Sequence, residues 1–122
     1  MQHNEAFLDL VNDAKTRVRE VDVHTYGRMA AASEAHLLID VREESEWNAG
    51  HAAGAVHLSK GIIERDIGKL VPDKSAKLVL YCGGGFRSAL AGDNLQKMGY
   101  GDVISLAGGW RAWNEAGMPV EK

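Results

Sequence analysis

Several residue patterns are scarce or missing in this chain of 122 residues, and each absence excludes a class of structure or site. There is a single cysteine, Cys82, so no internal disulfide can form. A lone thiol fits a reducing compartment, and we expect a cytoplasmic protein. With no second cysteine and no closely spaced histidine pair, the chain carries no metal-binding motif. We therefore expect no metal.

Charge of one sign and long hydrophobic runs are also missing. The chain has 14 basic and 17 acidic residues, a formal net charge of −3. Without a basic excess, we expect neither nucleic acid nor an anionic membrane as a partner. No run reaches membrane-spanning length, and the first 20 residues carry charges throughout, unlike a signal peptide. The length allows one domain with a proper core, and we see no repeat, low-complexity tract or linker.

Short apolar segments alternate along the chain with segments of helical spacing. Strands are predicted at residues 36–40, 54–58, 77–82 and 102–106. Helices are predicted at residues 24–35, 43–50, 62–71, 88–99 and 108–117. Buried strands that alternate with helices are typical of a parallel sheet covered on both faces. We therefore predict an α/β domain.

The N-terminal segment has the pattern of a separate amphipathic helix. Apolar residues recur at helical spacing, at Phe7, Val11, Ala14 and Val18. Asn4 is a suitable N-cap just before them. We interpret residues 1–20 as an added helix that packs on a domain formed by residues 21–122. A swapped arm, or a docking element for a partner or a second copy, is the alternative.

The most informative stretch is the one that follows the clearest strand, "KLVLYCGGGFRS", residues 77–88. Sites in parallel α/β sheets form beyond the carboxyl ends of strands, where the next helix begins, and we expect that helix to start at Ser88. Gly83, Gly84 and Gly85 can adopt positive φ and turn successive N–H groups toward one anion. Arg87 and the helix dipole add positive charge, which favours a reactive thiolate.

Such a cradle would stabilise an anionic group on the Cys82 sulfur, either a persulfide or a thiophosphate ester. The arrangement therefore predicts nucleophilic catalysis through a covalent intermediate. Taken alone, a free cysteine is more often a small buried hydrophobic residue, and glycines after a strand often form only a tight turn. The glycines, the arginine and the helix start together favour the catalytic interpretation.

Three motifs resemble those of the rhodanese-like sulfurtransferase domain, over about residues 22 to 120. The active loop of that family, Cys-x-x-Gly-x-Arg, is matched by "CGGGFR" at residues 82–87. The pattern Asp-Val-Arg followed by Gly-His-x-x-Gly-Ala is matched by "DVREESEWNAGHAAGA" at residues 40–55. An aliphatic strand followed by Gly-Gly and an aromatic helix is matched by "VISLAGGWRAWNEAGMPV".

This resemblance implies a central five-stranded parallel sheet flanked by helices, and a Cys82 that cycles between thiol and persulfide. A small donor such as thiosulfate would release sulfite, and cyanide or a thiol would accept the outer sulfur. The transferred sulfur would be bound covalently to Cys82, so neither an organic cofactor nor a metal is expected. The alternative is a sulfur-relay or regulatory binding module that turns over small molecules poorly and exchanges sulfur with a partner protein.

Loop length separates this interpretation from a phosphatase. Cysteine-dependent phosphatases, including those that share the rhodanese fold, have five residues between the cysteine and the arginine. Here only Gly83–Phe86, four residues, lie between them. A shorter loop suits one sulfur atom rather than a tetrahedral phosphate, and adding one residue is the change that would convert it.

Other polar residues of the motifs have structural interpretations that we favour. Asp40 would accept hydrogen bonds from nearby backbone, and Arg42 would pair with an acidic neighbour. His51, in the Gly-His motif, would have a hydrogen-bonding role.

The remaining candidates are two basic residues that follow the second predicted strand, and four aromatic residues. Lys60 and Arg65 would steer a dianion toward Cys82, or be solvated surface charges, with neither favoured. Phe86 would shape the pocket, because a loop residue there has little core to join. The tryptophans fall in amphipathic helices and are interpreted as packing residues: Trp47, Trp110 and Trp113.

Overall fold

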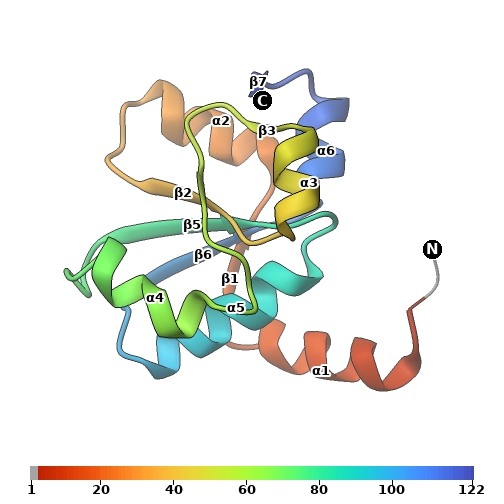
Figure 1. Cartoon of the computed structure of the whole chain (residues 1–122), viewed down its shortest axis with the longest axis vertical. Coiled ribbons are helices and arrows are strands. Elements are labelled where there is room, and N and C mark those ends of the chain that lie inside the picture. The colour runs from red at the N-terminus through yellow and green to blue at the C-terminus, as the bar shows by residue number, and fades with distance from the viewer. Residues whose placement is uncertain (1–2) are drawn as a thin grey trace.

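A five-stranded parallel sheet with helices on both faces forms the centre of the computed structural model, which describes residues 3–122 (Figure 1). The predicted fold class is therefore confirmed. Neighbouring strands follow the order β1 (Arg19–Val21), β6 (Asp102–Leu106), β5 (Lys77–Tyr81), β2 (Leu37–Asp40) and β4 (Val56–His57). Apart from this sheet, two short strands pair antiparallel, β3 (His51–Ala52) and β7 (Val120–Glu121).

The helices of the described residues are α1 (Glu5–Lys15), α2 (Val23–Ala31), α3 (Glu44–Ala49), α4 (Ile63–Leu70), α5 (Phe86–Lys97) and α6 (Gly109–Glu115). In Figure 1, α4 and α5 cover one face of the sheet, while α2 and α6 cover the other. Helix α5 begins at Phe86, earlier than the predicted start at Ser88. The reason is Gly85, whose left-handed backbone turns the chain into the helix directly after the loop.

Strand β5 lies in the middle of the sheet and shows why its sequence is apolar throughout. Leu78 and Leu80 pack with residues of α4 and α5, and Val79 packs with the cluster on the opposite face. All three side chains are fully buried. A parallel strand covered on both faces has no solvent side, so it reads as a continuous hydrophobic run.

Three short strands were not predicted from the sequence. In β1, at the edge of the sheet, only Val21 is buried, so the strand has no apolar run. Strands β3 and β7 have two residues each, too few for any periodicity, and β7 lies after the last predicted helix. Their pairing joins the C-terminal segment to residues 51–52.

Helix α1 is confirmed where the apolar spacing predicts it, and it packs along α5. The Asn4 side chain caps the helix by accepting a hydrogen bond from the Phe7 backbone N–H at 2.7 Å. Val11 and Ala14 are buried beneath it. Beyond its C-terminus, Arg17 binds Asp93 of α5 with Nε–Oδ1 at 2.8 Å and Nη2–Oδ2 at 2.9 Å. These contacts fix α1 on the outer side of α5.

The strand order places a crevice between the carboxyl ends of β2 and β5. From β2 the chain moves outward to β4, whereas from β5 it moves in the other direction to β6. Ligands of open α/β sheets bind where the order reverses in this way. Asp40 ends β2, and Cys82 follows the last residue of β5.

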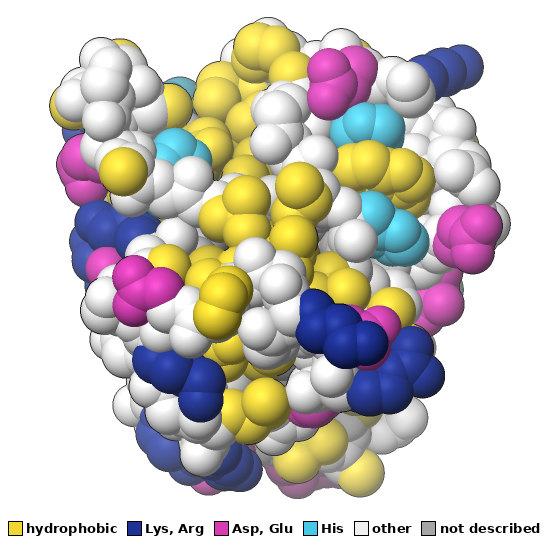
Figure 2. Space-filling view, turned by 60° about the vertical axis from the view of Figure 1, so that its left-hand side comes forward, with side chains coloured by type: hydrophobic (Ala, Val, Ile, Leu, Met, Phe, Trp, Pro, Cys, Tyr) yellow, Lys and Arg dark blue, Asp and Glu magenta, His cyan; other side chains and the backbone are white. Residues whose placement is uncertain are grey.

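The surface shows no strong segregation of charge on the face drawn in Figure 2, where basic and acidic side chains are interspersed around hydrophobic ones. None of the helices in residues 3–122 is both long enough and apolar enough to cross a membrane.

Candidate active site

Cys82 lies at the carboxyl end of β5 with its residue only 1 % exposed, and its sulfur accepts hydrogen bonds from the loop that follows. The backbone N–H groups of Gly85 and Ser88 donate to Sγ at 3.1 and 3.4 Å. Both donors belong to the turn that opens α5, where the helix dipole is positive. Two backbone N–H donors of the loop therefore point at the Cys82 sulfur.

The three glycines of the loop, each able to adopt positive φ, differ from one another in the structure. Only Gly85 adopts it, at φ +98°, and a Cβ there would lie 3.3 Å from the Gly108 backbone nitrogen. At Gly83 a Cβ would lie 3.0 Å from a guanidinium nitrogen of Arg87, whereas at Gly84 it would meet open space. Gly85 thus allows the left-handed backbone conformation of the loop, and Gly83 leaves room for the Arg87 side chain.

Two buried hydroxyls continue inward from the sulfur. Ser88 Oγ lies 3.5 Å from Cys82 Sγ and 2.8 Å from Ser105 Oγ, and both serines are fully buried. Ser105 comes from the neighbouring strand β6 and was not singled out from the sequence. The pair gives the sulfur a polar neighbour on the side that faces the protein interior.

Helix α6 holds the outer side of the Cys82 loop through backbone bonds. The N–H groups of Trp110 and Arg111 donate to the carbonyls of Cys82 and Gly83 at 2.7 and 3.1 Å. This approach requires a glycine at 109, where a Cβ would lie 2.3 Å from the Cys82 carbonyl oxygen. With these carbonyls occupied by α6, the loop's N–H groups at residues 85 and 88 stay directed at the sulfur.

Arg87 is held by Glu46, a residue that the sequence interpretation missed. Its guanidinium makes two bonds to the carboxylate, Nη1–Oε1 at 2.8 Å and Nη2–Oε2 at 3.2 Å. Glu46 also accepts the backbone N–H of Glu43 at 3.0 Å, which closes the capping box of α3. Hydrogen bonding to Arg87 lowers the pKa of Glu46, so the pair stays charged at neutral pH.

A cavity of about 980 Å³ opens above the sulfur. Cys82, Gly83, Gly84, Phe86 and Arg87 line it from the loop and the start of α5. It is also lined by Glu46, Arg111 and three residues at the N-terminus, His3, Phe7 and Leu8. Phe86 is thus on the cavity wall, and its role in shaping the pocket stays a prediction.

Lys60 and Arg65, considered for steering, do not line this cavity. Arg65 is exposed and bonded to its neighbour Asp66, with Nε–Oδ1 at 2.7 Å. The structure therefore gives the steering hypothesis no support. The cationic side chains that do reach the cavity are Arg87 and Arg111.

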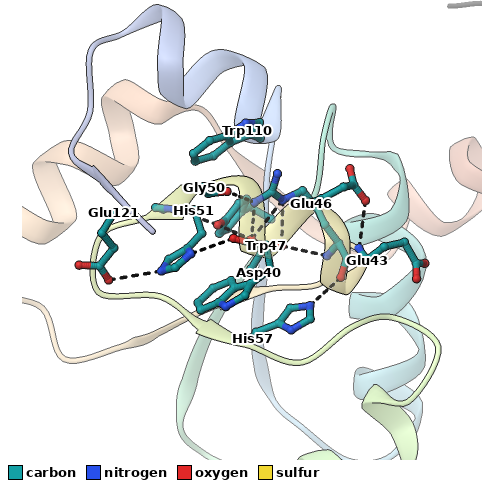
Figure 3. A network of polar contacts seen from close by, with 12 residues as sticks. Asp40, Glu43, Glu46, Trp47, Gly50, His51, His57, Trp110 and Glu121 are labelled. Atoms are coloured by element: carbon teal, nitrogen blue, oxygen red, sulfur yellow. Dashed lines mark hydrogen bonds and ion pairs between the residues drawn. The ribbon is translucent and has the colours of Figure 1, made fainter.

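Asp40, labelled in Figure 3, forms a buried ion pair with Arg42 beside the site. Asp40 accepts from the Arg42 backbone N–H at 2.9 Å and from its Nη2 at 2.8 Å. The Tyr81 hydroxyl donates to the same carboxylate at 2.6 Å, and burial followed by this bond raises the pKa of Tyr81. Arg42 also donates to the Gly50 carbonyl at 2.7 Å and lies over the Trp110 ring. These contacts fit the predicted structural roles.

His51 makes hydrogen-bonding and stacking contacts (Figure 3), and it is not among the residues that line the cavity. Its Nδ1 lies 3.1 Å from the Trp47 carbonyl, and its ring stacks on the Trp47 indole with centroids 3.4 Å apart. His57 stacks on the same indole at 5.1 Å. Its Nε2 lies 2.8 Å from the Arg42 carbonyl. Within residues 3–122, no cluster of His, Cys, Asp and Glu is arranged to hold a metal ion.

The family model for the rhodanese-like domain matches residues 22–116. The chain belongs to this family. The match includes the Cys82 loop, Glu46 and Arg111, whereas α1 lies before it. The boundary drawn between residues 20 and 21 from the sequence stays a prediction.

Relatives of this rhodanese-like domain include sulfurtransferases of similar length. A sulfurtransferase of Allochromatium vinosum is 33% identical over 103 residues, which cover 84% of this chain and 94% of that protein. The thiosulfate sulfurtransferase GlpE of Shewanella oneidensis is 33% identical over 98 residues, 80% of this chain and 94% of that one. The comparisons therefore support sulfur transfer as the general class of activity.

A solved structure also matches this rhodanese-like domain over nearly its whole length. It is a Rhodopseudomonas palustris protein described as a possible tyrosine phosphatase, with a TM-score of 0.83 and 24% identity. The alignment covers 99% of this chain and 98% of that one. At this identity the likeness shows the fold alone.

Sequence interpretation of this rhodanese-like domain missed the residues that reach the site from other elements. Glu46 carried a signal, since it stands at the third position of a short helix in the pattern of a capping box. Arg111 and the cavity wall from α1 carried none, because their place depends on how two helices pack around the loop.

Proposed function

We propose that this rhodanese-like domain moves sulfane sulfur from thiosulfate to a thiophilic acceptor through a persulfide on Cys82. The observation that supports it most is the position of the Cys82 sulfur. It lies at the edge of a cavity and accepts two backbone N–H groups, with the Arg87 guanidinium on the same cavity wall. A reducing compartment such as the cytoplasm suits this cycle, because the thiol must be regenerated.

In the first step, the Cys82 thiolate attacks the outer sulfur of thiosulfate. A bond forms between Sγ and that sulfur, while the sulfur–sulfur bond of thiosulfate breaks and its electron pair leaves with sulfite. The products are a persulfide anion and a sulfite dianion, so charge balances without an added proton. The N–H groups of Gly85 and Ser88 stabilise charge on Sγ, and Arg87 attracts the dianionic donor.

In the second step, the outer sulfur passes to a thiol or cyanide. A thiol acceptor forms a bond to the outer sulfur, the bond to Sγ breaks, and Sγ keeps that electron pair. The acceptor's proton ends on Cys82 and is lost to solvent before the next attack, which regenerates the thiolate, and the product is the anion of the acceptor persulfide. With a thiol acceptor, each half of the cycle exchanges one sulfur–sulfur bond for another, whereas cyanide forms a carbon–sulfur bond and leaves as thiocyanate. Neither route needs an oxidant or a cofactor.

The test is the intact mass of the protein after thiosulfate, with and without a reductant, beside Cys82→Ser as the matched control. Because Cys82 is the only cysteine, a reducible gain of one sulfur atom, absent in the variant, supports the proposal. An unchanged mass would overturn the thiosulfate donor. Loading by a protein persulfide alone would instead identify the relay module named as the alternative. Hydrolysis of an aryl phosphate without sulfur loading would identify a phosphatase.

A further inference from the structure

The cavity above Cys82 is far larger than the proposed donor requires. A volume of about 980 Å³ lies at the upper end of the range for pockets that hold drug-sized organic ligands. Thiosulfate has only five heavy atoms, so most of this space is left for the second substrate, the acceptor. The chemistry of the walls therefore bears on which acceptor fits.

One wall of the cavity is apolar and comes largely from α1. Phe7 and Leu8 line it together with Phe86 from the start of α5. His3 lies against both phenyl rings, with centroid distances of 5.1 Å to Phe7 and 5.0 Å to Phe86. Lys15 lies 5.1 Å from the centroid of the Phe86 ring. Neither a small inorganic dianion nor cyanide would gain from such a wall, whereas an aromatic or aliphatic body would.

This wall is fixed in place rather than loosely attached. Val11 and Ala14 of α1 are each only 1 % exposed, and the bonds between Arg17 and Asp93 hold the end of this segment on α5. Gln96 of α5 adds a bond from its Nε2 to the Arg17 carbonyl at 3.0 Å. The apolar side of the cavity is therefore a preorganised surface, which lowers the entropic cost of binding.

The cavity wall also carries a positively charged side chain, Arg111, whose charge is not neutralised within the part of the chain described, residues 3–122. Arg87 is bonded to Glu46, but the exposed guanidinium of Arg111 lines the cavity without an ion pair or side-chain hydrogen bond to any of these residues. A carboxylate on the bound molecule would complement it with two parallel N–H···O bonds.

The lining residues favour a small molecule over an extended peptide. They come from α1 and His3 just before it, from α3, α5 and α6, and from the Cys82 loop. No residue of a strand contributes, so the cavity offers no sheet edge to which a peptide backbone could add.

We infer that the cavity is the acceptor subsite for an organic thiol that has an apolar body and a carboxylate. The body would lie on Phe7, Leu8 and Phe86, the carboxylate on Arg111, and the thiol at the outer sulfur of the Cys82 persulfide. This inference rests on the proposed function for its sulfur-transfer step, whereas the binding itself can be measured separately.

The transfer experiment starts from protein loaded with persulfide and freed of donor. Its loss is followed by mass after addition of 4-mercaptobenzoate, thiophenol or 2-mercaptoethanol. Arg111→Gln should slow transfer to 4-mercaptobenzoate about fivefold, the size of an exposed charge pair, and leave thiophenol unaffected. Phe7→Ala should slow both aromatic thiols about fivefold but not 2-mercaptoethanol. Leu10→Ala is the matched control, since Leu10 is 57% exposed on α1 and does not line the cavity.

Equal slowing of all three thiols by Phe7→Ala would overturn the inference, because it would indicate a structural role only. So would an Arg111→Gln variant that treats 4-mercaptobenzoate and thiophenol alike. Preferred transfer to the cysteine of a protein, with no aromatic preference, would assign the cavity to a protein acceptor.

A second measurement does not depend on sulfur transfer. Benzoate, which carries the aromatic body and the carboxylate but no thiol, should slow alkylation of Cys82 by iodoacetamide in the unmodified protein. The protection should be lost in Arg111→Gln and kept in Leu10→Ala. Protection without persulfide loading would keep the subsite and reject the proposed function, whereas loading without protection or acceptor preference would reject the subsite alone.

Discussion

The ends of strands β2 and β5 lie side by side in the sheet, and each is followed closely by an arginine, yet the two places have opposite character. At the end of β2, the carboxylate of Asp40 is fully buried and accepts from Arg42 and Tyr81. At the end of β5, the Cys82 sulfur accepts two N–H groups and borders a cavity. A charge neutralised within the protein supports structure, whereas a nucleophile held at a cavity is available to a substrate.

The two arginines show the same contrast. The side chain of Arg42 is 3% exposed, and its fit between Asp40 and the Trp110 ring leaves it no route to a ligand. The side chain of Arg87 is 32% exposed, and Glu46 holds it on the cavity wall. An ion pair can thus either stabilise the fold, when the arginine is buried on all sides, or orient the arginine toward a ligand, when part of its side chain faces a cavity.

The largest expected effect on stability comes from breaking the pair at β2. Asp40→Ala leaves Arg42 buried without its counter-charge, and we expect a loss of about 3–5 kcal/mol in the free energy of unfolding by urea. Persulfide formation by the protein that remains folded should persist. Replacing both residues, Asp40→Ala with Arg42→Met, should recover part of the loss. If Asp40→Ala alone were as stable as the unmodified protein, the structural role assigned to the ion pair at the end of β2 would be refuted.

The next largest effect is expected at Gly109, where α6 meets the Cys82 loop. Gly109→Ala combines a positive φ of +49° with a Cβ 2.3 Å from the Cys82 carbonyl oxygen, so the loop must shift. We expect about 2–3 kcal/mol of destabilisation together with loss of most persulfide formation. Gly117→Ala is the matched control, since its φ is +68° but a Cβ there would meet open space. It should lose about 1 kcal/mol and keep its chemistry. Equal behaviour of the two variants would show that backbone strain alone matters.

Glu46→Gln tests whether Glu46 is a positioning residue for Arg87. Loss of this part-exposed pair should change the free energy of unfolding by no more than about 1 kcal/mol. The rate of persulfide formation with thiosulfate should fall about fivefold, because the guanidinium is no longer oriented. Glu44→Gln on the same helix should leave that rate unchanged. If both variants react at the normal rate, Arg87 does not need Glu46 to act.

The smallest expected effect is the pH dependence of the same pair. Hydrogen bonding to Arg87 lowers the pKa of Glu46 below its ordinary value of 4.5. A group with a lowered pKa in the folded state stabilises the protein fully above its unfolded pKa, and this stability is lost as pH falls through the folded pKa. The difference in unfolding free energy between the unmodified protein and Glu46→Gln should therefore be constant from pH 7 to about 5. It should shrink below 4.5, and a difference that grew on acidification would contradict the assignment.

Local sequence patterns predicted the parts of the fold and site that depend on neighbours in the chain. Strand β5 is a continuous apolar run, and the Cys82 loop places its glycines, Phe86 and Arg87 within one short segment. These features could be found without knowing how the chain folds.

The residues that were missed come from distant segments. Glu46 meets Arg87 across 41 positions of sequence, and Phe7 reaches the cavity only because α1 packs along α5. Such contacts depend on how the helices are oriented relative to one another, and the spacing of apolar residues in the sequence does not specify this orientation. Lys60 and Arg65 illustrate the opposite error, since closeness in sequence to a strand end did not bring them to the cavity.

The backbone bonds from α6 set a limit on how this site could be re-engineered. Trp110 and Arg111 donate to the carbonyls of two consecutive loop residues, Cys82 and Gly83, and Arg111 also lines the cavity. An extra residue inserted next to Gly83 would move one of these carbonyls away from its donor and shift Arg111 relative to the sulfur. Lengthening the loop at this point to admit a phosphate would therefore require a compensating change at the start of α6. This adds a condition to the sequence-based expectation that one added residue converts the site.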